Sequence, residues 1–165
     1  FFKSDWSYSS LVKSKIYIAN LDFANLEGAN LTEARLNGAS LRGANLIDAT
    51  LISTVLSKSK LDEIILDGAN LIYTKFRGAY LQKAKFNGSI VFFTDFSAAD
   101  LTEAEMIALD LTNSVFTSAK LDKINFMNTY VSGMNFAKFN LTKGNFINSI
   151  TCNTIFPCGE DLDKC

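Results

Sequence analysis

A large apolar residue occupies every fifth position of this chain, without a break, from Leu11 to Phe146. In an α-helix, which turns ~100° per residue, a step of five residues would spread these side chains around the whole cylinder. In a straight β-strand, an odd step would send successive side chains to opposite faces of the sheet. The backbone must therefore turn a corner once in every five-residue repeat, and this requirement predicts a solenoid.

Two further regularities accompany these large residues, which we call the centres of the repeats. The position two residues before a centre is mostly alanine, serine or threonine, as Ala24 is before Leu26. Glycine recurs two residues after a centre, as at Gly28. Small residues beside large ones fill a tightly wound interior, and glycine is favoured where the backbone turns. The pattern predicts that centres and small residues point inward and that the glycines lie at corners.

Six tripeptides resemble the A(D/N)LXX signature of pentapeptide-repeat proteins, namely Ala-Asn-Leu at 19–21, 24–26, 29–31, 44–46 and 69–71 and Ala-Asp-Leu at 99–101. The resemblance covers residues 9–148 and implies the fold of that family. This fold is all-β, a right-handed quadrilateral β-helix with four repeats per coil, and the chain is long enough for about seven coils. We expect the β-helix over 9–148, with an N-terminal cap over 1–8 and a C-terminal cap over 149–165.

If each coil holds four repeats, centres twenty residues apart should lie directly above one another. One such column begins with Leu21 and Leu41 and contains only leucine through Leu141. Another begins with Ile16 and is aromatic from Phe76 onwards. A coil of three repeats would scatter the phenylalanines among all columns, so the order at twenty residues supports four repeats per coil.

Both predicted caps depart from the repeat in composition. The N-terminal cap contains four aromatic side chains, Phe1, Phe2, Trp6 and Tyr8. We interpret them as a plug over the first coil, with a binding role as the alternative. In the C-terminal cap, Thr151 replaces a large centre and Pro157 is the only proline of the chain. We expect a short turn of helix in this segment.

All three cysteines, Cys152, Cys158 and Cys165, lie in the predicted C-terminal cap. A disulfide between two of them would stabilise a segment too small to hold itself, and would leave the third as a thiol. A metal site is the weaker alternative, because the chain has no histidine and the spacing is not C-x-x-C. The resembled family includes thylakoid-lumen members with a disulfide in a C-terminal cap. We expect an oxidising compartment, namely a thylakoid lumen, a periplasm or the exterior, and leave the cytoplasm open.

The formal net charge is −1, and we expect acidic and basic residues to be mixed on the walls of the coil. A nucleic-acid-binding protein would need a clustered positive face, and no apolar run reaches the ~20 residues of a membrane span.

Histidine, the commonest general base, is absent, and the glycines do not form a phosphate-binding loop. Carboxylate pairs such as Asp62 and Glu63 should lie on a solvated wall. Asparagines such as Asn20 and Asn25 should bond the backbone of a neighbouring turn. We therefore predict a protein without catalytic residues, cofactor or metal ion.

The outward positions of the repeats are mostly polar, but apolar residues gather on one wall. They are Ile52, Ile72, Tyr73, Ile90, Phe92 and Phe93. Stacking of the coils should place Ile72 and Phe92 in one column and Tyr73 and Phe93 in a second column beside it. We predict a contact surface for a protein partner or for a second copy of the chain. The alternative is a strand surface that merely favours β-forming residues.

Five positions that are usually small carry large residues instead. They are Ile64, Leu109, Ile124, Met134 and Phe139. Because four of the five follow residue 100, we expect the coils to widen or become irregular mainly in the C-terminal half.

The leading functional prediction is a non-catalytic structural or protein-interaction module. It would be a peripheral subunit of a larger lumenal or periplasmic assembly, would dock through the apolar wall, and could lie beside a membrane complex without spanning the membrane. The resemblance also includes DNA-mimicking proteins that bind type II topoisomerases, but their mechanism needs a strongly negative face. A secreted effector or surface protein is the third possibility.

Overall fold

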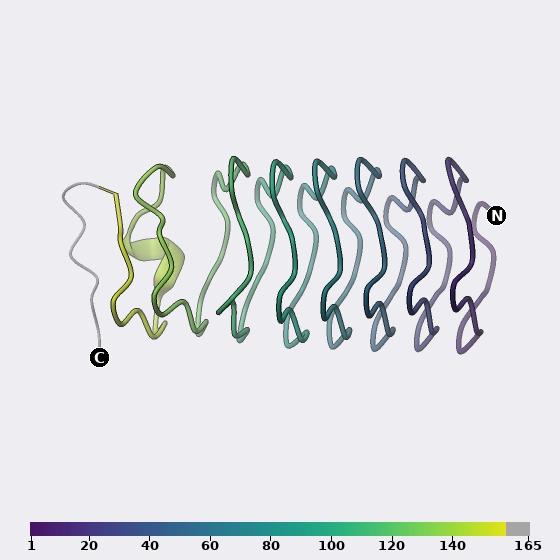
Figure 1. Ribbon diagram of the computed structural model, residues 1–165, viewed down its shortest axis with the longest axis horizontal. Helices are drawn as coiled ribbons and strands as arrows, with labels where there is room; N and C mark the ends of the chain where they lie inside the picture. Colours follow the sequence, from purple (N-terminus) through teal and green to yellow (C-terminus); the bar gives the residue numbers. More distant parts are fainter. Residues whose placement is uncertain (158–165) are drawn as a thin grey trace.

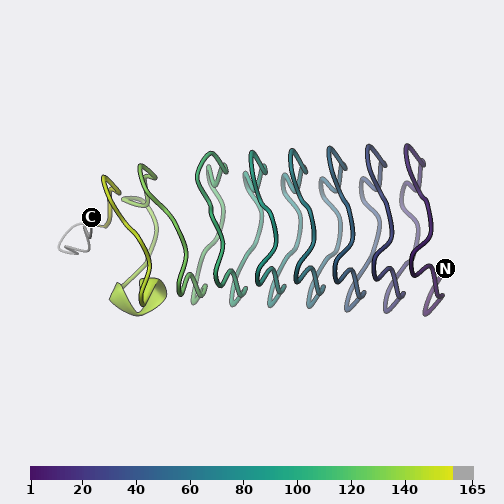
Figure 2. The same ribbon diagram turned by 90° about the horizontal axis from the view of Figure 1, so that it is seen from below.

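The computed structural model describes residues 1–157, which wind into a rod of stacked coils (Figure 1). Residue numbers increase steadily from one end of the rod to the other, as the second view also shows (Figure 2). Isolated parallel β-bridges join residues twenty apart, from Asp5 with Asn25 to Asn135 with Ile155. Four repeats therefore complete one coil, and the predicted right-handed quadrilateral β-helix is confirmed.

Each corner of the coil is a four-residue turn that begins at a centre. At one corner the Ala24 N–H donates to the Leu21 carbonyl oxygen at 3.0 Å, and Phe23 between them has φ 57°. A positive φ at the third residue alone is typical of a type II turn, which explains why glycine recurs at this position. The same left-handed conformation recurs every five residues along the rod, except at Lys138 and Lys143.

Backbone hydrogen bonds connect each coil to the next, and asparagines before the centres reinforce them. The Leu26 N–H donates to the Asn45 carbonyl at 2.7 Å. The Asn20 Oδ1 accepts the Asp22 N–H at 2.9 Å within its own corner. The Asn45 Nδ2 donates to the Asn25 Oδ1 of the preceding coil at 3.2 Å. The asparagines thus bond the backbone of the adjoining turn, as predicted, and also bond each other between coils.

Columns of centres fill the interior. Leu41 and Leu61 are completely buried, one above the other. Phe76 and Phe96 stack with ring centroids 5.3 Å apart and planes 5° apart, while Phe86 meets Phe76 edge-on at 5.9 Å. The predicted twenty-residue columns are therefore observed, and burial of each such side chain contributes about 1.5–3 kcal/mol.

On one side of the interior, buried threonines occupy the small positions, which elsewhere are mostly alanine. Thr54, Thr74 and Thr94 are fully buried in successive coils. The Thr74 Oγ1 donates to the Leu51 carbonyl at 2.6 Å, and the Thr94 Oγ1 donates to the Leu71 carbonyl at 2.9 Å. Each hydroxyl is satisfied by the coil before it, which is why polar residues are tolerated in this core.

The coil geometry extends past both predicted boundaries of the β-helix. Within the predicted N-terminal cap, Trp6 occupies the position of a centre and is half-buried. Its backbone N–H donates to the Asn25 carbonyl at 2.7 Å. Beyond residue 148, Tyr130 pairs with Ile150 in the ladder, and Thr151 fills a buried centre. Residues 1–8 and 149–157 therefore wind like the rest of the rod, because their backbone forms the same hydrogen bonds to the adjacent coil. The rest of the predicted C-terminal cap, 158–165, lies outside the described residues.

A helical turn, η1, spans Lys143–Phe146, before the predicted C-terminal cap. Residues 149–157 of that cap contain no helical turn, and the expectation of one over 158–165 stays a prediction. Within η1 the Asn145 N–H donates to the Thr142 carbonyl at 3.0 Å, so it is unavailable to the ladder. The Asn145 side chain replaces this ladder bond, because its Nδ2 donates to the Ile124 carbonyl of the preceding coil at 2.6 Å. The helical turn thereby stays attached to the rod.

Candidate interaction surfaces

The residues predicted to form a contact surface lie together, and we call them the apolar wall. The apolar wall comprises Ile52, Ile72, Tyr73, Ile90, Phe92 and Phe93. The rings of Tyr73 and Phe93 stack with centroids 5.1 Å apart and planes 3° apart. Phe92 meets Phe93 edge-on, with centroids 4.6 Å apart. The two predicted columns therefore merge into one aromatic cluster.

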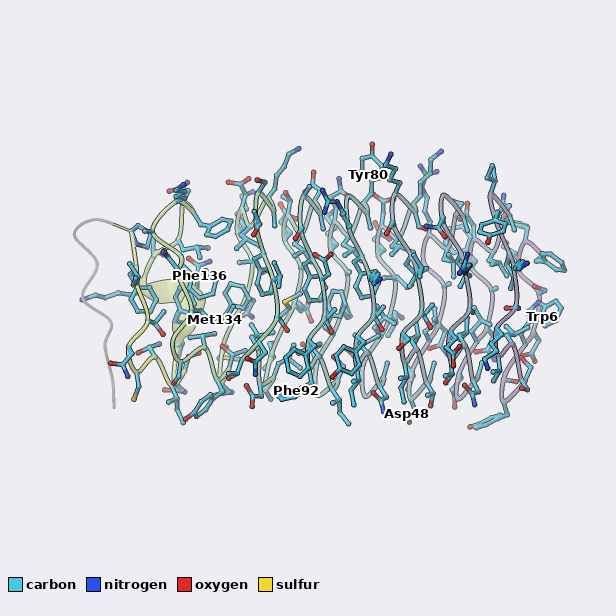
Figure 3. The ribbon with its side chains drawn as sticks, in the orientation of Figure 1. Trp6, Asp48, Tyr80, Phe92, Met134 and Phe136 are labelled. Atoms are coloured by element: carbon cyan, nitrogen blue, oxygen red, sulfur yellow. The ribbon has the colours of Figure 1, made fainter. Side chains whose placement is uncertain are left out.

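The apolar wall is accessible to solvent. Tyr73 and Ile90 are each 52% exposed, and Phe92 is 41% exposed. Phe92 lies on the same edge of the rod as Asp48, whereas Tyr80 lies on the opposite edge (Figure 3). Other large apolar side chains, among them Ile18 and Phe23, are exposed elsewhere on the rod, but an exposed cluster of touching aromatic rings is typical of a contact site.

The wall opposite the apolar wall carries charges of both signs. The Lys120 Nζ lies 3.1 Å from the Asp100 Oδ2, and at the adjoining corner the Lys123 Nζ lies 3.2 Å from the Glu103 Oε1. Exposed pairs of this kind contribute about 0–1 kcal/mol each. This side of the rod has the solvated, mixed-charge surface that the sequence predicts.

A second candidate site is a cleft between two successive coils. Residues from 112–119 line one side and residues from 132–139 line the other, and the cavity volume is about 850 Å³. The Phe96 N–H donates to the Val115 carbonyl at 2.8 Å, but in the described part of the chain no equivalent bond joins Phe116 to Asn135. The coils, evenly spaced from purple to teal, are further apart in this green segment in both views (Figures 1 and 2). The backbone ladder is open here.

Bulky residues at two consecutive small positions account for the opening. Met134 replaces Ser114 of the preceding coil, and Phe139 replaces Ala119. The Ser114 Oγ donates to a carbonyl one coil earlier at 2.7 Å, a bond that methionine cannot make. The sequence predicts that the coils widen in this half of the chain, but it does not predict where a cleft forms. Ile64 is also a large residue at a usually small position, and it is buried while the ladder around it stays intact.

The described residues whose pKa departs from its ordinary value, Asp5, Tyr8 and Asp100, lie at the surface of the rod. A hydrogen bond from the Ser7 backbone N–H lowers the pKa of Asp5. A hydrogen bond from the Tyr8 hydroxyl to the Glu27 Oε1, 3.0 Å long, raises the pKa of that tyrosine. Within residues 1–157, no three His, Cys, Asp or Glu side chains gather as a metal site. These shifts report local hydrogen bonds rather than a nucleophile paired with a base.

Of the three disulfide candidates, Cys152 lies among the described residues. It follows the buried centre Thr151 and is itself half-buried. Cys158 and Cys165 lie outside the described residues, so the pairing of the three cysteines stays a prediction.

Comparison with protein-family models matches the chain to pentapeptide repeats, in eight copies, over residues 19–57, 51–88 and 94–133. These segments cover most of the rod, including the corners and the buried columns described above. This chain belongs to the pentapeptide-repeat family. No curated protein sequence matches it.

Solved pentapeptide-repeat structures resemble the rod. Two trypsin-treated forms of QnrB1, a plasmid-mediated fluoroquinolone resistance protein, have TM-scores of 0.56 and 0.52 at 17% and 20% identity. Those matches cover 97% and 90% of this chain, and 86% and 80% of the QnrB1 chains. A pentapeptide repeat protein from the Arabidopsis thaliana thylakoid lumen is 25% identical with a TM-score of 0.37, over 61% of this chain and 66% of its own. The similarity to QnrB1 shows the fold alone.

Proposed function

We propose that this pentapeptide-repeat protein is a non-catalytic interaction module and a peripheral subunit of a larger assembly. It docks a protein partner through the apolar wall. The observation that carries this proposal is the exposed cluster of Tyr73, Phe92 and Phe93, whose rings contact one another at the surface. Aromatic side chains that stay exposed in a cluster are favoured anchors of protein interfaces.

The backing of the apolar wall also supports a docking role. Directly beneath it, the centres Leu71 and Val91 are almost completely buried. The Thr74 and Thr94 hydroxyls hold the carbonyls of Leu51 and Leu71 in the coils behind them. The Tyr73 N–H also donates to the Phe92 carbonyl at 3.0 Å, although within residues 1–157 no ladder bond joins Val91 or Phe93 to the following coil. A surface held by the preceding coils in this way loses little conformational entropy when a partner binds.

The double variant Ile72→Asp with Phe92→Asp tests this function. Both side chains point outward, so we expect the circular dichroism spectrum and the melting temperature to change little. Capture of the partner from extracts of the source cells should be lost. Tyr80→Asp is the matched control, because Tyr80 is 50% exposed but lies on the opposite wall. Capture that survives the double variant, or is lost equally with the control, would contradict the proposal.

We propose an oxidising compartment, a lumen, a periplasm or the exterior, on the strength of the three cysteines near the C-terminal end. Within residues 1–157, no helix has the length and hydropathy of a membrane span. Alkylation of the unfolded protein with and without prior reduction tests the compartment. One modified cysteine without reductant and three with reductant are expected, and three in both samples would contradict a disulfide.

A further inference from the structure

The apolar wall belongs to a wider surface whose charged side chains are all acidic from residue 27 to residue 153; Lys13, in the coil before, lies 3.7 Å from the Glu33 Oε2. In one coil this acidic-apolar face comprises Ile47, Asp48, Thr50, Ile52 and Ser53, and it repeats every twenty residues. From residue 27 to residue 153 its carboxylates are Glu27, Glu33, Asp48, Asp67 and Asp110. None of its positions in this range is lysine or arginine, although the whole chain has 16 such residues.

The basic residues of these coils lie on the other walls and corners. Arg35 and Lys75 lie on the wall that follows the acidic-apolar face, Lys60 and Lys120 lie on the opposite wall, and Lys85 lies on the fourth wall. The expectation that both signs are mixed on the walls is therefore wrong for this face from residue 27 onwards. The net charge of the chain does not show this separation of charges, because it does not say on which wall each charged residue lies. Each residue must first be assigned to a wall from its position in the twenty-residue coil.

Three carboxylates around the apolar wall lack a cationic partner. Asp48 and Asp67 lie at one corner of the face, and Asp110 lies one coil after Ile90 at the same repeat position, although no bridge joins these two residues in the described part of the chain. In the described part of the chain, none of the three forms an ion pair. The Asp67 Oδ1 accepts the N–H of the residue twenty positions ahead at 2.8 Å, and the Asp110 Oδ1 accepts the Thr112 N–H at 2.9 Å. Their charge is thus available to a partner.

We propose that the acidic-apolar face docks a cationic amphipathic segment of another protein. Its apolar side chains would lie on the apolar wall, and its lysine or arginine side chains would lie beside Asp48, Asp67 and Asp110. This inference rests on the proposed docking role and names the chemistry of the partner. Buried apolar anchors supply affinity, while complementary charges around them orient the partner and speed its association.

Other occupants fit this face less well. A second copy would bring two sets of carboxylates together with Lys13, already paired with Glu33, as the one cation on each face, and nucleic acids or anionic lipids would be repelled. Mimicry of duplex DNA needs about one negative charge per 1.7 Å. Five carboxylates over five coils at ~4.8 Å per coil give roughly one per 5 Å, with aromatic rings between them. The face is too sparse for a DNA mimic and suits a basic, apolar protein segment.

Two synthetic amphipathic helical peptides of roughly 18 residues provide the probe, one with lysine and one with glutamate at its polar positions and the same leucines. Fluorescence anisotropy should show that the lysine peptide binds and the glutamate peptide does not. Raising NaCl from about 50 to about 300 mM should weaken binding, because exposed charges are screened. The triple variant Asp48→Asn, Asp67→Asn and Asp110→Asn should weaken binding roughly tenfold or more.

A second triple variant, Glu63→Gln, Glu105→Gln and Asp122→Asn, removes the same charge outside this face and should change binding less than about twofold. Equal losses in the two triple variants would overturn the inference, since net charge alone would then explain binding. If the first triple variant has no effect but Ile72→Asp with Phe92→Asp abolishes binding, the docking role stands and the partner chemistry is wrong. Sedimentation equilibrium of the wild type should show a monomer. A dimer that dissociates in the Ile72/Phe92 double variant would make a second copy the occupant and overturn the inference.

Discussion

The ring centroids of Phe116 and Phe136 lie 6.5 Å apart, whereas those of Phe96 and Phe116 lie 5.1 Å apart. All three belong to one column of centres, so the difference records a real separation of two coils. It coincides with the coil in which Met134 and Phe139 occupy small positions. Side-chain volume beside the centres, rather than the centres themselves, therefore sets the local pitch of the rod.

Amide hydrogen exchange should detect this separation in the native protein. The Phe96 N–H donates to a carbonyl of the next coil at 2.8 Å, while in residues 1–157 the Phe116 N–H has no such partner. We expect the Phe116 amide to exchange at least about tenfold faster than the Phe96 amide. Equal protection of the two amides would show that the ladder is closed in solution.

The double variant Met134→Thr with Phe139→Ala should close the cleft. Threonine at 134 can donate to the carbonyl of Leu111, as the Thr154 Oγ1 donates to the Val131 carbonyl at 2.8 Å. Removal of the bulk at 139 lets the two coils approach to the regular spacing. Protection of the Phe116 amide should rise by at least about tenfold. If the amide still exchanges rapidly, another feature, such as η1, holds the coils apart.

The buried hydroxyls predict a contrast between two similar substitutions. Thr74→Val removes a buried hydrogen bond to the Leu51 carbonyl and should lower the free energy of unfolding by about 1–2 kcal/mol. Thr112→Val removes a buried hydroxyl that has no hydrogen-bond partner in residues 1–157, so it should be neutral or slightly stabilising. Urea unfolding measures both, and equal effects of the two variants would contradict the role of the threonine column.

The buried columns could be predicted from the sequence because a five-residue repeat with fixed corners leaves only one inward position for large residues. Leu41 and Phe96 are completely buried for this reason. The same register placed Tyr73 over Phe93 on the outside. The cleft could not be predicted, because Ile64 and Phe139 occupy equivalent positions with opposite outcomes. Whether a large side chain is absorbed or pushes the coils apart depends on its neighbours, and Phe139 follows a second bulky residue in the same coil.

The corner glycines should differ in how much they tolerate a methyl group. Gly43 and Gly88 both have positive φ, so alanine at either site costs about 1–2 kcal/mol in backbone strain. At Gly43 a Cβ atom would also lie 2.7 Å from the Phe23 ring, whereas at Gly88 nothing lies within 4 Å. Gly43→Ala should therefore destabilise the fold more than Gly88→Ala, by about 1 kcal/mol. Thermal unfolding decides, and a larger effect at Gly88 would contradict this account of the corner.

Asp100 should make the stability of the rod depend on pH. Partial burial favours the neutral acid, but a 2.6 Å hydrogen bond from the Thr102 hydroxyl and the Lys120 ammonium at 3.1 Å outweigh it and hold the pKa of Asp100 below its usual value. Because the pKa is lowered on folding, the carboxylate stabilises the fold above the unfolded-state value of ~3.9, and this contribution is lost as the pH falls through the folded-state pKa. Asp100→Asn should therefore cost about 0.5–1 kcal/mol near neutral pH and progressively less below pH ~4. Lys120→Met, which removes the ion pair but keeps the Thr102 bond, should show a smaller change of the same sign. Urea unfolding at a series of pH values measures the difference, and a cost for Asp100→Asn that stays constant down to the most acidic point would mean that the carboxylate acts through its shape rather than its charge.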